Sequence, residues 1–339
     1  MKVLLTGATG FVGLNIVEAL LEAGHDVVSY QRQGARRRYL DLLGPVVVEG
    51  ELDDVRQLRH AMQDVDAVIH TAGMTSCRQK DWPALQRCNV QGTAAVLEAA
   101  RQCKVGRLVF TSTTSTIGST GRQGEAADEN TPLRGWRASS PYARSKQEAE
   151  RTLLAQDDVP VVILNLAEVV GAWDHTLQWG RIVLAVARDQ LPFIPPGSAT
   201  YCSGRDAARA HVQALVLGRS GERYIIGRDC MAISSFVALV GQRLGAEPRP
   251  RSRLPWRWQR LDSGLRQWAC EHRLAGISPP AVEPYRMRVF GTHHLFSDDK
   301  ARRELGYHCQ GITHAIDDCF HWYRQHGFLD GLPSPPLLS

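Results

Sequence analysis

The sequence predicts an α/β fold, a doubly wound parallel sheet followed by a smaller substrate-binding region. Over about the first 170 residues, short apolar runs alternate with segments of helical periodicity, which is the pattern of successive βαβ units. A glycine-rich turn joins the first apolar run to the first helical segment. Beyond about residue 170 this alternation breaks down and prolines cluster, which predicts less regular elements that cap a substrate.

The first turn has the features of a nucleotide-binding loop. Val3–Leu5 predicts a buried strand, Gly7, Gly10 and Gly13 follow, and a helix begins directly afterwards. Gly7 permits a tight turn, Gly10 lets a pyrophosphate approach the backbone, and Gly13 lets the helix pack close to the strand. The helix N-terminus adds unpaired N–H groups and a partial positive charge. The spacing is G-x-x-G-x-x-G, and its strand–turn–helix context favours a bound dinucleotide.

The second strand, Asp26–Tyr30, indicates which nicotinamide cofactor binds. A carboxylate at its end would hold the ribose 2′-hydroxyl of NAD, whereas an arginine accommodates the 2′-phosphate of NADP. The chain continues here with Gln31 and Arg32 and has no carboxylate in reach. Arg32 is therefore the expected 2′-phosphate partner, and NADP(H) is favoured over NAD(H). We interpret Arg36–Arg38 as a charge run in water.

The remaining elements of the first domain follow from the same patterns. Asp53 is expected to cap a helix that carries Val55, Leu58 and Met62, and a longer helix is expected from about Ala84 to Gln102. Further strands are predicted at Val46–Val48, Ala67–Gly73, Arg107–Thr111 and Val159–Leu164.

Composition limits the class of protein. With 43% hydrophobic and 22% charged residues and a formal charge of +5, the chain resembles an ordinary globular protein, and a nucleic-acid partner is not expected. The first strand begins at residue 2, no apolar run is long enough to span a bilayer, and cytoplasm is the expected compartment. The eight scattered cysteines predict reduced, mostly buried thiols, and no metal site is expected.

Two separate segments carry residues suited to acid–base chemistry. Thr111–Thr116 places hydroxyl groups at the end of a predicted strand. Tyr142 and Lys146 are four residues apart, so they share one face of a predicted helix. A neighbouring ammonium group lowers the pKa of a tyrosine, which suits the phenol to proton transfer.

The chain resembles the extended branch of the short-chain dehydrogenase/reductase superfamily, the NAD-dependent epimerase/dehydratase type. Its pattern is most similar to the 3-beta-hydroxysteroid dehydrogenase and dihydroflavonol reductase side. The resemblance implies a Rossmann domain of about seven strands and a small C-terminal substrate domain. The matching segments are the glycine loop, His70–Gly73, Asn89–Thr93, the hydroxyl-rich strand end, Tyr142 with Lys146, Gly204–His211 and Ser297–Tyr307.

The resemblance also implies roles for single residues. Tyr142 would be the general acid/base, Lys146 would lower its pKa and bind the nicotinamide ribose, and Thr113 would position the substrate oxygen. Ser112 and Thr114 flank Thr113, and the choice among the three stays open. The implied cofactor-binding residues are Gly7, Thr9, Gly10, Phe11, Val12, Gly13, Arg32, Glu51, Leu52, Thr71, Ala72, Gly73, Tyr142, Lys146, Leu166 and Val169. The residues expected on the substrate side are Thr75, Trp173, His175 and Trp179.

One departure from the family pattern concerns the end of the sixth strand, where Asn165-Leu166 replaces the usual Arg-Pro. This places the nicotinamide-side contacts of Leu166 to Val169 in question. The expected domains are residues 1–170 with a return at about 198–230, a substrate region at about 171–197 and 231–328, and a tail at 329–339.

The expected function is an NADP(H)-dependent oxidoreductase that interconverts a ketone and a secondary alcohol on a small apolar or cyclic substrate. The alternatives are a sugar-nucleotide epimerase with tightly bound NAD, and a non-catalytic NADP-sensing regulator. A homodimer through the helices near residues 84–102 and 140–156 is implied. The stretch Arg249–Arg273 suits a diphosphate, a membrane surface, or an irregular helix with tryptophans in the core and arginines in water.

Overall fold

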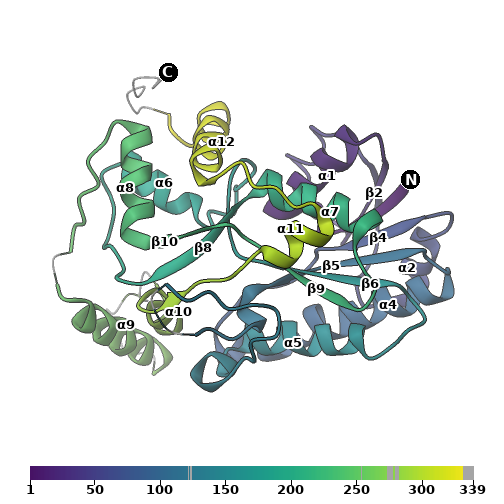
Figure 1. Ribbon diagram of the computed structural model, residues 1–339, viewed down its shortest axis with the longest axis horizontal. Helices are drawn as coiled ribbons and strands as arrows, with labels where there is room; N and C mark the ends of the chain where they lie inside the picture. The colour runs from purple at the N-terminus through teal and green to yellow at the C-terminus, as the bar shows by residue number, and fades with distance from the viewer. Residues whose placement is uncertain (121, 123, 253, 273–277, 279–281, 331–339) are drawn as a thin grey trace.

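The computed structural model describes residues 1–339 except 121, 123, 253, 273–277, 279–281 and 331–339. A seven-stranded sheet, in which all neighbouring strands run parallel, forms its centre in the order β3-β2-β1-β4-β5-β6-β9 (Figure 1). This confirms the predicted fold class. The strands are β1 (Lys2–Thr6), β2 (Asp26–Gln31), β3 (Val46–Glu49), β4 (Ala67–His70), β5 (Arg107–Thr113), β6 (Val161–Leu166) and β9 (Glu222–Ile226).

Helices cover both faces of this sheet, because its strands are apolar on both sides. Successive side chains of a strand point to opposite faces, so Val3 and Leu5 join one core while Leu4 joins the other. The first core contains α1 (Phe11–Glu22) and α7 (Gly204–Leu217). The second contains α2 (Val55–Ala61), α4 (Gly92–Gln102) and α5 (Pro141–Leu154).

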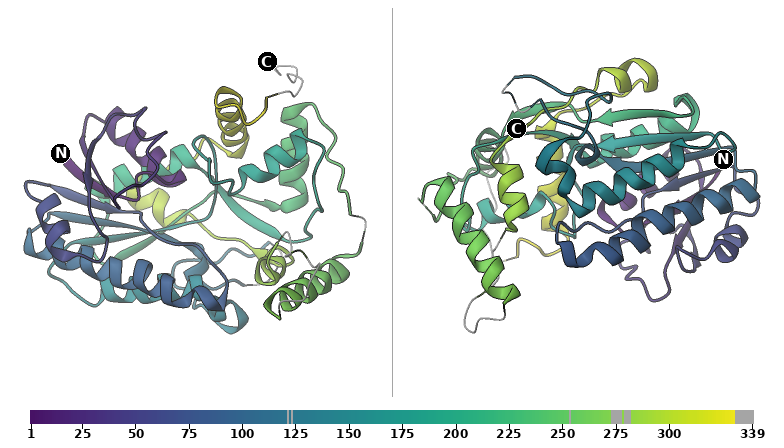
Figure 2. Two further views of the ribbon diagram at one scale, coloured as in Figure 1. Left: turned by 180° about the vertical axis from the view of Figure 1, so that it is seen from behind. Right: turned by 90° about the horizontal axis from the view of Figure 1, so that it is seen from below.

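A second, smaller sheet forms the C-terminal part of the molecule (Figure 2). It contains β7 (Glu168–Val170), β8 (Ser198–Ser203), β10 (Asp229–Ala232) and β11 (His293–His294). The helices of this half are α6 (Gly180–Ala187), α8 (Ile233–Leu244), α9 (Trp256–Glu271), α10 (Pro284–Phe290), α11 (Asp299–Leu305) and α12 (Ile312–Gln325). The region is thus more regular than the sequence pattern indicated. The return to the large sheet begins at Gly204 and not at residue 198, because β8 pairs with the strands of the small sheet.

Two helix predictions need correction. The helix expected from about Ala84 to Gln102 is divided into α3 (Trp82–Leu85), a π-helical segment η2 (Gln86–Gln91) and α4. Asp54 caps α2 instead of Asp53: its Oδ1 accepts hydrogen bonds from the backbone N–H groups of Arg56 and Gln57. Asp53 forms an ion pair with Arg87 at 2.7 Å. Short 3₁₀ segments lie at η1 (Gln79–Asp81), η3 (Thr114–Thr116) and η4 (Gly135–Ser139).

The tryptophan-rich segment forms the regular helix α9, and its tryptophans do not all lie in the core. Trp256 packs against Phe193, whereas the side chains of Trp258 and Trp268 are exposed. The expectation of core tryptophans is therefore wrong for these two, while its arginines 257, 260 and 266 do lie in water. Within the described residues, no helix has both the length and the apolar character needed to cross a bilayer.

The cysteines form no disulfide and differ in exposure. Cys202 and Cys319 are buried, Cys230 is exposed, and the other five are half-buried. The expectation of mostly buried thiols therefore holds only in part.

Candidate active site

The glycine loop brings three segments of backbone closer together than side chains would allow. Gly7 has a φ of +77°, and a Cβ there would lie 2.5 Å from the backbone nitrogen of Ala72. A Cβ on Gly13 would lie 2.1 Å from the Gly7 carbonyl oxygen. Gly10 occupies the N-cap of α1, and no side chain bonds to the first N–H groups of this helix. The loop therefore presents free N–H groups and a bare backbone to the space above it.

That space is a cavity of about 1740 Å³ along the carboxyl ends of the parallel strands. Ligands of open α/β sheets bind in this position. The sequence-predicted residues that line it are Gly7, Thr9, Gly10, Phe11, Val12, Gly13, Arg32, Glu51, Leu52, Thr71, Ala72, Gly73, Thr75, Thr113, Tyr142, Lys146, Leu166, Val169, His175 and Trp179. Leu166 and Val169 are among them although Asn165 replaces the arginine of the family pattern.

Trp173 is the exception, and the expectation that it lines the substrate side is wrong. Its ring packs against Trp322 and Tyr39, and its indole nitrogen donates to Glu18 at 3.2 Å. Trp173 has a φ of +69°. The chain turns at this residue, so its side chain enters an aromatic cluster below α12, away from the cavity.

Arginine side chains follow β2 at the end of the cavity where we expect the adenosine. Arg32 and Arg36 both line the cavity, while Arg37 lies 3.9 Å from Asp41 and Arg38 lies over the ring of Tyr39. All three residues 36–38 are exposed, in agreement with their interpretation as a charge run in water, and Arg36 lines the cavity as well. No carboxylate directly follows β2, in agreement with the sequence.

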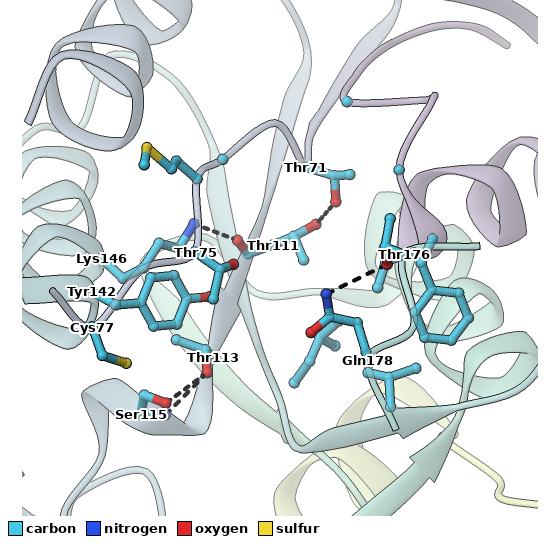
Figure 3. A pocket seen from close by; sticks show the side chains of 18 of the residues that line it. Thr71, Thr75, Cys77, Thr111, Thr113, Ser115, Tyr142, Lys146, Thr176 and Gln178 are labelled. Atoms are coloured by element: carbon cyan, nitrogen blue, oxygen red, sulfur yellow. Dashed lines mark hydrogen bonds between the residues drawn. The ribbon is translucent and has the colours of Figure 1, made fainter. Parts of the chain in front are cut away.

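Tyr142, Thr113 and Lys146 face the same part of the cavity (Figure 3). The phenol of Tyr142 lies near the hydroxyl groups of Thr75 and Thr113, which favour the phenolate, yet burial has the larger effect and raises the pKa of Tyr142 to about 12. Burial also lowers the pKa of Lys146 to about 8. Tyr142 is thus a neutral phenol at neutral pH, because burial affects its pKa more strongly than the neighbouring groups do.

The buried carboxylate of Glu150 distinguishes Thr113 from its neighbour Ser112. Glu150 Oε1 accepts hydrogen bonds from the Ser112 hydroxyl, from Thr116 Oγ1 at 2.8 Å and from Asn165 Nδ2 at 2.7 Å. Because strand side chains alternate, Thr113 points to the opposite side and meets the phenol of Tyr142. Asn165, on β6, thus links the end of β5 to the carboxylate of Glu150 on α5.

A hydrogen-bond chain behind the site positions Lys146. Its ammonium donates to the carbonyl oxygen of Thr111 at 2.8 Å and lies 3.9 Å from the centre of the Phe110 ring. His211 is buried, its pKa is lowered to about 4, and Nδ1 donates to the carbonyl oxygen of Ala207 at 2.7 Å. Nε2 must therefore accept from the Thr111 hydroxyl, 2.8 Å away, and Thr111 in turn accepts from Thr71.

The substrate end of the cavity combines an apolar wall with charged groups that the sequence analysis missed. The apolar wall consists of Trp179, Ile182, Ala185, Leu191, Phe193, Val237, Val282, Val289 and Phe290. Glu168 accepts a hydrogen bond from the Trp179 indole, and burial raises the pKa of its carboxyl. Arg137 Nη1 is buried without a hydrogen-bond partner in the described structure, and Arg286 also lines the cavity. These residues come from η4, β7 and α10, and no motif marks them in the sequence.

The cavity fits a nicotinamide dinucleotide. Gly7 and Gly13 leave no room for a Cβ, and the uncapped α1 N-terminus suits a pyrophosphate. Arg32 and Glu51, which follow the ends of β2 and β3, line the same cavity as Tyr142, Lys146 and the apolar wall.

Comparisons with known proteins agree with this assignment. The pattern of the NAD dependent epimerase/dehydratase family matches residues 3–227. The chain is 32% identical to a putative dihydroflavonol 4-reductase of Synechocystis, over 96% of this chain and 95% of that protein. It is 28% identical to a 3 beta-hydroxysteroid dehydrogenase/Delta 5-->4-isomerase of Mycobacterium tuberculosis, over 95% and 90% of the respective lengths.

Among solved structures, that of gox2253 has a TM-score of 0.80 and 29% identity, and the match covers 96% of this chain and 98% of that one. The family pattern spans well over half of the chain, and it includes the glycine loop, Tyr142 and Lys146. The chain therefore belongs to the NAD dependent epimerase/dehydratase family and is an enzyme that uses NAD(H) or NADP(H).

Proposed function

We propose that this protein is an NADP(H)-dependent oxidoreductase that interconverts a ketone and a secondary alcohol on a small apolar or cyclic substrate. The observation that carries the proposal is the position of the Tyr142 phenol. It lies beside Thr113, in the same cavity as the dinucleotide loop and the apolar wall. A carbonyl oxygen between Tyr142 and Thr113 would have two hydroxyl donors and an apolar surface for the rest of the substrate.

The chain's residues divide the reaction between them. When bound, the nicotinamide supplies a hydride to the carbonyl carbon, or accepts it in the reverse direction. Thr113 donates a hydrogen bond that holds the carbonyl oxygen, and Tyr142 gives this oxygen its phenolic proton. A pKa of about 12 keeps that proton on Tyr142 at neutral pH, which suits reduction. Lys146 holds the nicotinamide ribose, with its ammonium fixed by the Thr111 carbonyl oxygen.

Preference for NADP(H) is supported by the cations at the adenosine end. Arg32 and Arg36 line the cavity directly after β2, where a 2′-phosphate would stand. Arg32 carries the stronger expectation, because it follows the last residue of the strand.

A sugar-nucleotide epimerase is the second candidate, and the arginines of the substrate end favour it. Arg137, Arg181 and Arg286 line this end, and no ion pair to a carboxylate is found for them among the described residues. Such a cluster suits a diphosphate. A cofactor-sensing regulator would have no use for Tyr142 and Lys146.

A homodimer through α4 and α5 stays a prediction of the family resemblance. The two helices pack against each other on one face of the large sheet (Figure 2). A four-helix contact between two copies would extend this layer.

Replacing Tyr142 tests the reaction directly. Tyr142→Phe should lower kcat by at least about 100-fold in carbonyl reduction, because the proton donor is lost, while the Kd of NADPH changes little. Tyr285→Phe is the matched control, since Tyr285 lines the same cavity, and it should retain activity within about tenfold. Unchanged turnover in Tyr142→Phe would remove this residue from the mechanism.

The pH dependence of cofactor use follows from Lys146. Its pKa of about 8 means that the ammonium loses its proton as the pH rises through 8. The kcat/KM for NADPH, which reports the free enzyme, should therefore fall above about pH 8. Lys146→Arg keeps a positive charge and should remove this fall, although its activity is lower. The same fall in the variant would assign the ionisation to another group.

Charge reversal at Arg32 tests the cofactor assignment. Arg32→Glu should weaken NADPH binding about 10- to 100-fold by losing a charge-assisted hydrogen bond, and leave NADH binding unchanged or stronger. Arg37→Glu is the control, because Arg37 lies beside Asp41. Equal losses for NADPH and NADH, measured by fluorescence titration, would contradict the 2′-phosphate role.

The state of the cofactor distinguishes the two candidate functions. A reductase exchanges its cofactor in every turnover, so the freshly purified protein should bind added NADPH reversibly and release little NAD on denaturation. An epimerase returns the hydride to its substrate and retains the cofactor. Stoichiometric NAD in the denatured supernatant, identified by chromatography, would favour the epimerase.

A further inference from the structure

Helix α9 carries an apolar face that no other part of the described structure covers. Trp258, Leu261, Leu265 and Trp268 recur at intervals of three, four and three residues, so they lie on one side of the helix. Their exposed fractions are 52%, 56%, 66% and 53%. Leu254, just before the helix, is 60% exposed. Four large apolar side chains in one row form a patch of a kind that marks an interaction site.

The opposite side of α9 holds the helix on the protein. Ser263 Oγ donates to the carbonyl oxygen of Val282 at 2.7 Å, and the ring centre of Trp256 lies 5.4 Å from that of Phe193. The helix lies at one end of the molecule beside α10 (Figure 1). The exposed row is therefore free to meet another surface while α9 keeps its packing.

The sequence around this apolar row is rich in arginine. The segment 249–273 contains seven arginines but only Asp262 and Glu271 as acidic residues. Arg257, Arg260 and Arg288 line a groove next to the row, together with Trp136 and Tyr285. Arg288 lies 4.3 Å from the centre of the Trp136 ring. No ion pair to a carboxylate is found for these three arginines within the described part of the chain.

We propose that α9 docks on an anionic phospholipid bilayer and lies in the plane of its interface. Tryptophan and leucine on one face with arginine beside them is the composition of interfacial amphipathic helices, and tryptophan prefers the headgroup level. The groove of Arg257, Arg260 and Arg288 supplies the complementary charge for lipid phosphates. A second copy of the chain would bring its own arginines against these, so charge favours the lipid surface.

This placement connects the membrane with the candidate active site. Tyr285 lines both the groove and the active-site cavity, and Val282 and Arg286 beside it also line the cavity. The substrate end therefore lies next to the docking face, where an apolar substrate can pass from the lipid to the cavity. The docking itself goes beyond the proposed function and does not depend on it.

Vesicle binding tests the proposal without any assay of activity. The full-length protein should sediment with vesicles of phosphatidylcholine containing 30% phosphatidylglycerol, and about tenfold less with pure phosphatidylcholine vesicles. Leu261→Glu/Leu265→Glu should lower the partition coefficient at least tenfold. Arg257→Ser/Arg260→Ser should also lower it about tenfold or more, and added salt should reproduce this loss.

Val216→Glu/Leu217→Glu provides the matched control, because these α7 residues are also exposed, at 68% and 51%. This variant should bind vesicles as the wild type does. Brominated lipid should quench the tryptophan fluorescence of the wild type, and Trp258→Phe/Trp268→Phe should lose most of this quenching. Equal vesicle binding by the wild type and Leu261→Glu/Leu265→Glu would overturn the proposal. The proposal would also be overturned if the wild type did not bind vesicles and instead formed a dimer in ultracentrifugation. In that case only the Leu261→Glu/Leu265→Glu variant would be monomeric.

Discussion

The close approach of three backbone segments at the glycine loop is the constraint on which the site depends. Gly7 lies against Ala72 at the end of β4, and Gly13 lies against Gly7 itself, with no space for a Cβ at either position. His70 reinforces this junction, because its ring nitrogens lie 2.7 Å from Thr6 Oγ1 and 3.0 Å from Thr93 Oγ1. Burial lowers the pKa of His70 to about 3, so it acts as a neutral bridge between two strands and a helix.

A second buried polar group shapes the reacting end of the same cavity. Glu150 gathers Ser112, Thr116 and Asn165 around one carboxylate oxygen, and Arg223 lies 3.6 Å from the other. Removing two partners of this group would leave a buried charge short of hydrogen bonds, which is costly. The network thus fixes the end of β5, and with it the direction in which Thr113 and the Thr111 carbonyl oxygen point.

The two halves of the molecule contribute different properties to the cavity. The half that contains the large sheet supplies the glycine loop, Arg32 directly after β2, and the Tyr142–Lys146 pair on α5. The C-terminal half supplies the apolar wall, Glu168 and Arg286, and it carries helix α9 on its outside. The Tyr142–Lys146 chemistry would then be common to the family, while the C-terminal half would select the substrate. On the proposed docking of α9, that substrate would enter the cavity next to the lipid surface.

The sequence by itself determined the parallel sheet, the dinucleotide loop and the Tyr142–Lys146 pair, because these depend on local periodicity and short spacings. The sequence-based predictions for Asp53 and Trp173 were wrong, and both side chains contact segments that are distant in the chain. Asp54 caps α2 because the helix begins at Val55, while Asp53 pairs with Arg87 instead, and the ring of Trp173 packs in an aromatic cluster with Trp322 of α12.

Only the tertiary structure decided which strand-end hydroxyl faces Tyr142, because Glu150 and Asn165 hold Ser112 on the other side of the strand. The tertiary structure also brought Arg137, Glu168 and Arg286 together at the cavity. These residues come from three separate segments, and no local sequence pattern marks any of them. The burial that raises the pKa of Tyr142 arises from this packing as well. Local spacing can place two residues on one helix face, but only the assembled fold sets how much water reaches them.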